Sequence, residues 1–127
     1  LVAGVHGQPH HVVRTALGVG HSFPAALQAV PPSRLRPRLP AQVGEDALWD
    51  YAYNQQLCPA TIPAQLEEML VEQALAREIV RSLVSSARPD WGQGTGKLLP
   101  PFGPLIGAGA ILTEAPHPGV ALTVPRG

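Results

Sequence analysis

The chain has 127 residues, which is enough for one small domain, and 45% of them are hydrophobic. Only 14% are charged, whereas Gly and Pro fill 13 and 15 positions, so the sequence predicts many turns and a surface poor in charge. The formal net charge of zero argues against a protein that binds nucleic acid through electrostatic attraction.

Cysteine content and hydropathy indicate the compartment. Cys58 is the only cysteine, which excludes an internal disulfide and favours a reducing environment. No apolar run approaches the roughly 20 residues that span a bilayer, and no signal-peptide pattern is present. We therefore expect a cytoplasmic protein with neither nucleic acid nor membrane as its partner. Because the sequence begins with Leu1 instead of Met, we also expect a piece of a longer protein.

The first third of the chain predicts a hairpin and a short helix. Two β-rich runs flank a Gly/Pro loop, which indicates a β-hairpin over residues 1–15. Ser22 is a candidate N-cap for a helix over residues 22–30, in which Pro24 is tolerated because it lies in the first turn.

The middle of the chain predicts an irregular connection followed by a helix. Residues 31–43 are rich in proline and lack periodicity, and we interpret their clustered arginines as part of a solvated loop: Arg34, Arg36 and Arg38. Residues 45–57 are acidic at the start and predict a helix. One face of that helix is expected to contain Leu48, Tyr51, Ala52 and Gln55.

A long helix is expected from residue 63 to residue 87. Thr61 or its neighbour caps the start, and Arg88-Pro89 is expected to end the helix. A broad apolar arc is expected to be buried: Leu66, Met69, Leu70, Ala76, Ile79, Val80, Leu83 and Val84. A narrow polar stripe is expected on the opposite face: Glu67, Glu78, Arg81, Ser82 and Ser85.

Two features are candidate binding elements. An apolar strand over residues 103–113 is broken by a turn at Gly107 and Gly109, which is either an ordinary strand-to-helix turn or a close approach of backbone N–H groups to a ligand. Glu78, Arg81 and Ser85 are spaced i, i+3, i+7 on one helix face. Either Glu78 and Arg81 form an i,i+3 ion pair on a solvated helix face, or the three side chains contact a ligand.

Several motifs, taken in order, resemble the MutL family of glutamate mutase accessory proteins. These motifs are Ala60-Thr61-Ile62-Pro63, Glu72-Gln73-Ala74-Leu75-Ala76-Arg77-Glu78, Leu98-Leu99-Pro100-Pro101-Phe102 and Thr113-Glu114-Ala115-Pro116. The resemblance covers the chain from about Val12 to Pro116. It implies an α/β fold, namely the second half of an actin-like (ribonuclease H-like) ATPase. Residues 1–116 would be a partial ATPase domain, and residues 117–127 an irregular tail.

The resemblance also implies a function and a site. Members of this family release damaged cobalamin from glutamate mutase in an ATP-driven, chaperone-like reaction, so the implied partners are subunits of a cobalamin-dependent mutase. Gly107, Gly109 and Ala110 would form the turn that closes over adenosine, and Glu78, Arg81 and Ser85 would hold its ribose and base. The family usually has a second glycine at the position of Ala110.

The chain is expected to lack the catalytic half of such an ATPase. The phosphate motifs and metal-positioning aspartates would precede Leu1, so ATP or ADP with Mg²⁺ belongs to the intact protein. We assign no catalytic or metal-binding residue to this chain and expect it to be inactive alone. The alternative is a small non-enzymatic binding or scaffold module that docks a partner through the broad apolar helix.

Overall fold

The structure is a computed structural model that describes residues 2–5, 8–11, 13–91, 106 and 108–113. Most of these residues are helical. The helical segments are α1 (Phe23–Ala29), α2 (Pro32–Leu35), the 3₁₀ helix η1 (Arg36–Arg38), α3 (Glu45–Leu57), α4 (Leu66–Trp91) and α5 (Ala110–Thr113). None of the helices in these ranges is long and apolar enough to cross a membrane.

The predicted α/β fold is wrong, because the described part of the chain is mostly helical. Val2–Val5 (β1) and Gln8–His11 (β2) pair antiparallel as an isolated ribbon, and the described residues contain no larger sheet for it to join. Within the segment 103–113, where a strand was expected, Ala110–Thr113 forms α5. The backbone carbonyl of Gly109, just before this helix, accepts hydrogen bonds from the backbone N–H groups of Leu112 and Thr113.

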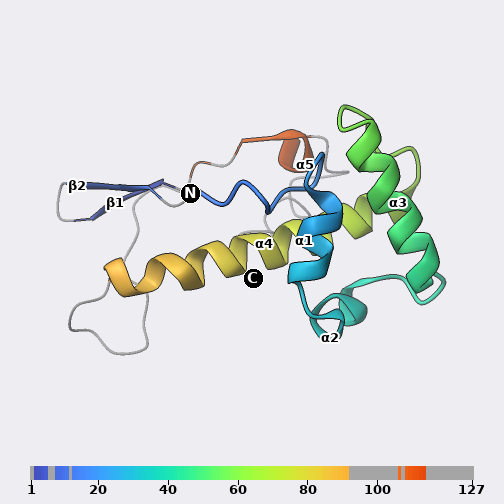
Figure 1. The fold of residues 1–127 in the computed structure, drawn as a ribbon, viewed down its shortest axis with the longest axis horizontal. Helices are drawn as coiled ribbons and strands as arrows, with labels where there is room; N and C mark the ends of the chain where they lie inside the picture. The colour runs from blue at the N-terminus through green and yellow to red at the C-terminus, as the bar shows by residue number, and fades with distance from the viewer. Residues whose placement is uncertain (1, 6–7, 12, 92–105, 107, 114–127) are drawn as a thin grey trace.

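The long helix α4 organises the fold. Its 26 residues extend for about 39 Å, and Figure 1 shows it running through the molecule with α3 near one end and the β1–β2 ribbon near the other. It begins at Leu66, three residues after the predicted start, because the Glu68 carboxylate accepts hydrogen bonds from the N–H groups of Ala64 and Gln65 at 2.8 and 3.2 Å. That side chain satisfies backbone donors in front of the helix, as a capping residue does.

The end of α4 also differs from the prediction. Pro89 was expected to end the helix after residue 87, but α4 continues to Trp91 with Pro89 inside it. A proline at this position cannot donate the backbone hydrogen bond to the residue four positions earlier, and α4 ends two residues after it.

The core lies between the first part of α4 and the helices α1, α2 and α3. Phe23 is fully buried, and its ring meets the ring of Tyr51 edge-on, with centroids 5.6 Å apart and planes at 86°. The fully or largely buried apolar residues are Phe23, Ala26, Leu27, Val30, Leu35, Val43, Ala52, Val71, Ala74, Leu75 and Ile79. The predicted helix over 45–57 is confirmed, and the predicted inner face of α3 contributes Ala52 directly to this core.

The buried face of α4 matches the predicted arc only in part. Ile79 is buried as predicted, and Leu83 packs against the core, but Leu66 is 57% exposed. The core face also contains Val71, Ala74 and Leu75, which were not part of the predicted arc. Glu78 lies on this same face and is buried. The apolar arc read from the sequence was too broad to identify the side that α1, α2 and α3 cover. The buried side of α4 is therefore turned about the helix axis relative to the predicted one.

The segment 31–43 is not the solvated loop that we predicted. It folds into α2 and η1, and Leu35 enters the core at 3% exposure. Arg36 donates a hydrogen bond from Nη1 to the Val43 carbonyl at 2.6 Å. The predicted helix over 22–30 matches α1, but Ser22 donates its hydroxyl to the Thr15 carbonyl at 2.9 Å and makes no side-chain cap bond.

The core can be tested with one pair of leucines. Leu75 is 1% exposed and Leu57 is 78% exposed. We expect Leu75→Ala to lower the free energy of unfolding by about 2–5 kcal/mol, because it leaves a cavity in the core. Leu57→Ala should change it by less than about 0.5 kcal/mol. Urea denaturation of both variants measures the difference, and equal losses would show that α4 does not pack with this face inward.

Candidate functional site

The structure places the predicted adenosine contacts on two sides of α4. Glu78 faces α2 and η1, where Arg34 and Arg38 lie within ion-pair distance of it. Gly109 instead lines a cavity together with Ala76 and Val80. Ala76 and Glu78 are two residues apart, so they lie on nearly opposite faces of the helix, since each residue turns it by about 100°. The two groups of predicted site residues do not form one site.

Glu78 is the centre of a buried charge cluster. Its carboxylate is 1% exposed, and the Nη1 atoms of Arg38, Arg81 and Arg34 lie 3.0, 3.8 and 3.9 Å from its oxygens. These contacts are ion pairs by distance, but none has the alignment of a hydrogen bond. The predicted pair Glu78–Arg81 is therefore present, but its Glu78 carboxylate is buried, whereas the Arg81 side chain is 35% exposed.

The remaining predicted residues have different environments. Ser85 is exposed on α4, and Gly107 lies outside the described residues. Ala110 is the first residue of α5. Gly109 has a φ of +126°, and a Cβ atom placed on it would meet nothing within 4 Å. The positive φ is therefore the reason for glycine at this position. Lack of space is not, since the surroundings are open.

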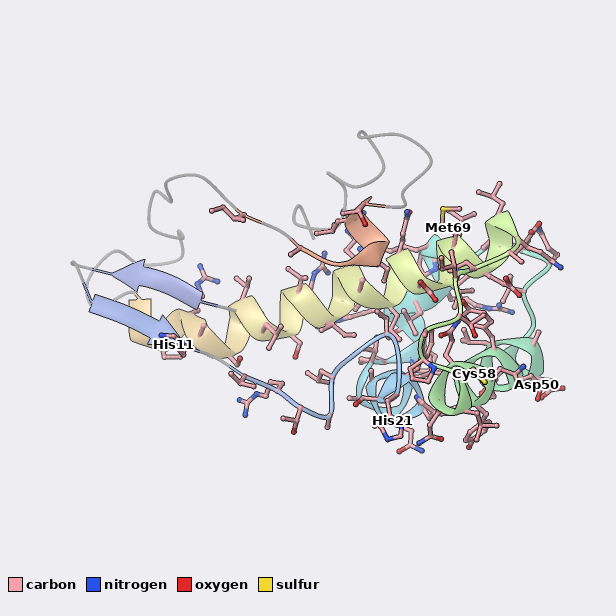
Figure 2. All side chains as sticks on the ribbon, turned by 90° about the horizontal axis from the view of Figure 1, so that it is seen from above. His11, His21, Asp50, Cys58 and Met69 are labelled. Atoms are coloured by element: carbon pink, nitrogen blue, oxygen red, sulfur yellow. The ribbon has the colours of Figure 1, made fainter. Side chains whose placement is uncertain are left out.

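The best candidate site is the cavity beside Gly109. It has a volume of about 490 Å³ and lies between α4, α5 and the loop that follows α3. Figure 2 shows Met69, which belongs to its wall, pointing from α4 toward the side on which α5 lies. Apolar groups from these three elements and from the segment before α1 line it: Val19, Pro59, Ile62, Pro63, Met69, Ala76, Val80, Ile111 and Leu112. This size and lining are typical of pockets for small molecules.

A chain of three polar side chains enters the wall of this cavity. Gln55 Nε2 lies 2.9 Å from the hydroxyl oxygen of Tyr51 and donates to it. Tyr51 in turn donates to Glu72 Oε1 at 2.7 Å. Burial is the main cause that raises the pKa of the Glu72 carboxyl, and the negative charge of Glu68 adds to this effect, whereas the Tyr51 hydrogen bond opposes it. Burial and the neighbouring Glu72 also raise the pKa of Tyr51 well above its usual range.

Gln73 is the second polar group in the wall. It is 7% exposed, and its amide makes no hydrogen bond with the described residues; its Nε2 atom is both buried and without a partner. Buried amide groups are ordinarily hydrogen-bonded, because leaving one unpaired costs about 1–3 kcal/mol. Glu72 and Gln73 therefore give a largely apolar cavity two polar contact points.

Sequence reasoning missed most of this site. Gln73 and Glu72 were quoted only within a motif, and Tyr51 only as part of a helix face. One signal was available: Glu72 and Gln73 lie next to each other between apolar residues of a long helix, where charged and amide side chains need partners.

Comparison with protein-family models, with curated proteins and with solved structures found no match. The resemblance to MutL-type proteins stays a prediction from the sequence.

The backbone at Gly109 gives a testable consequence. Gly109→Ala should destabilise the turn before α5 by about 1–3 kcal/mol, because a Cβ atom strains a residue at positive φ. Gly44 is a suitable control: it precedes α3 with φ −71°, also has nothing within 4 Å, and tolerates a Cβ atom without strain. Hydrogen exchange of the Leu112 and Thr113 amides measures the effect. Unchanged protection in Gly109→Ala would contradict the described turn.

The raised pKa of Glu72 predicts how stability changes with pH. The native state holds the Glu72 proton at pH values where the unfolded state, with a pKa of about 4.3, has released it. The contribution of Glu72 to stability is therefore lost as the pH rises from about 4.3 through the native pKa. As the pH rises over this range, we expect the parent to lose unfolding free energy relative to Glu72→Gln, which has no carboxyl to titrate at this position.

Chemical denaturation of both proteins between about pH 4 and pH 8 measures this difference. Glu67→Gln is the control, since it removes the same charge from the same helix at a position outside the cavity wall. A difference between Glu72→Gln and the parent that does not change with pH would mean that the carboxyl is not desolvated.

Proposed function

We propose that this chain is a non-enzymatic binding module, and that the cavity between α4, α5 and the 59–63 loop holds an apolar group of its ligand. The single observation that carries the proposal is the cavity itself, with a volume of about 490 Å³ and a largely apolar wall. Burying a ligand there removes apolar surface from water, which contributes about 25 cal/mol per Å².

The composition of the wall supports binding over catalysis. Among the described residues that line the cavity, Glu72 is the only one with an ionisable side chain. Its described hydrogen bond is with Tyr51, so the wall offers no pair of nucleophile and base among these residues. A single carboxylate in an apolar wall can fix the orientation of a ligand, which is the usual role of the few polar groups in such pockets.

The proposal differs from the role implied by the MutL resemblance. A nucleotide carries several negative charges, and the ionisable group in the cavity wall is also an acid. The arginines that gather on α4 and its neighbours lie around Glu78, away from this wall. The geometry therefore favours the alternative of a binding module, and ATP-driven cofactor exchange rests on the sequence resemblance alone.

Filling the cavity tests the proposal. Ala76 lies in the wall of the cavity on α4, so Ala76→Phe places a ring in the space available to a ligand. We expect the parent chain to bind the neutral apolar dye Nile red saturably, and Ala76→Phe to bind it at least about tenfold more weakly. Fluorescence titration of the dye measures both affinities.

The control carries the same new side chain on the same helix. Ser85 is exposed and lies outside the cavity wall, so Ser85→Phe should bind Nile red like the parent. Circular dichroism of both variants confirms that α4 is folded. If Ala76→Phe binds the dye as tightly as the parent does, the cavity is not the binding site.

A further inference from the structure

Glu72 is a buried carboxylate that forms no ion pair with any described residue. It is 7% exposed, and the described ion pairs of the chain all belong to Glu78. Its described hydrogen-bond partner is the neutral hydroxyl of Tyr51, at 2.7 Å from Oε1. Buried carboxylates are ordinarily paired with a cation, because desolvation of an isolated charge costs several kcal/mol.

The carboxylate is held in a fixed position against the cavity. Tyr51 is itself fixed by the hydrogen bond from Gln55 Nε2 at 2.9 Å and by the edge-on contact with Phe23. This chain of contacts links the core to Glu72, which lines the cavity. A ligand therefore meets a carboxylate whose place is already set, so little conformational entropy is lost on binding.

A second polar group lies next to Glu72 in the same wall. Gln73 is 7% exposed, and its amide makes no hydrogen bond with the described residues. The rest of the wall is apolar apart from Gln55, Thr61 and backbone groups. The wall is thus suited to an apolar body that carries one polar head.

The sign of the charge selects the class of ligand. An anion such as a fatty acid or a nucleotide would bring a second negative charge close to Glu72 in a poorly solvated place, which is unfavourable. A protonated amine has the opposite charge, and its N–H groups can donate to the Glu72 carboxylate.

We propose that the cavity binds a small organic cation, an apolar molecule with one amine that pairs with Glu72. This inference rests on the proposed function, because it assigns the chemical class of the ligand to the same cavity. Glu72 sets the preference for the charge, and the apolar wall contributes affinity that does not depend on charge.

Three naphthalene derivatives separate these two contributions. Naphthylmethylamine is a cation at pH 7, naphthylmethanol is neutral and naphthylacetic acid is an anion, while the naphthylmethyl body is the same in all three. We expect the amine to bind the full chain about tenfold or more tightly than the alcohol does, as one hydrogen-bonded charge contact provides. The acid should bind most weakly. Isothermal titration calorimetry measures the three affinities.

Glu72→Gln removes the charge and keeps an oxygen that can accept the Tyr51 hydrogen bond. We expect this variant to bind the amine no more tightly than the alcohol. Circular dichroism checks that the variant is folded. The matched control is Glu67→Gln, which should keep the tenfold preference for the amine because Glu67 lies outside the cavity wall.

The outcomes distinguish this inference from the proposed function. If the alcohol binds and the amine binds no better, the cavity is a binding site but the assignment of an organic cation is wrong. A preference for the amine that survives in Glu72→Gln also overturns it, because Glu72 would not be its source. If none of the three compounds binds the parent chain, both the proposed function and this inference fail.

Discussion

The burial of Glu78 is the constraint on which the described fold depends. A carboxylate that is 1% exposed is costly to desolvate, and it is tolerated here because guanidinium groups of Arg34, Arg38 and Arg81 lie within 3.9 Å of it. Two of these arginines come from α2 and η1, and the third comes from α4 itself. The cluster therefore connects the short helices to the long one, next to the apolar contacts of Leu35 with the core.

This constraint also decides which side of α4 is free to form a site. The face with Glu78, Leu75 and Ile79 is covered, so Met69, Ala76 and Val80 face the cavity and α5. In Figure 1, α5 lies beside α4 at a distance from the β1–β2 ribbon, and residues 110–113 of the expected strand segment form this helix. The cavity on this side of α4 is largely apolar, with Glu72 and Gln73 as the polar side chains that α4 contributes.

The local structure was more predictable than its assembly. Acidic residues at its start and apolar spacing identified α3 with its bounds, because capping and periodicity are local properties. The orientation of α4 could not be derived in the same way. Its apolar residues cover most of its circumference, and only the packing of α1, α2 and α3 decides which of them are buried. The role of Arg34 and Arg38 was missed for a related reason, since their partner Glu78 lies about forty residues further along the chain. Gly109 was singled out as a turn position, and it has a positive φ directly before the helix α5, which agrees with the helical side of the strand-to-helix alternative.

Two buried carboxylates on one helix show how structure and binding can be told apart in this chain. Glu78 is surrounded by three cations, all from this chain, so its charge is neutralised when the protein folds. Glu72 is buried to a similar degree, but its described partner is an uncharged hydroxyl, and its pKa is raised mainly because burial disfavours the charged form. Since the two groups have the same chemistry and lie on the same helix, the difference between them comes from their surroundings. The first is paired with cations of the fold. The second lines the cavity and forms no described ion pair, which is why we propose that a cation binds there.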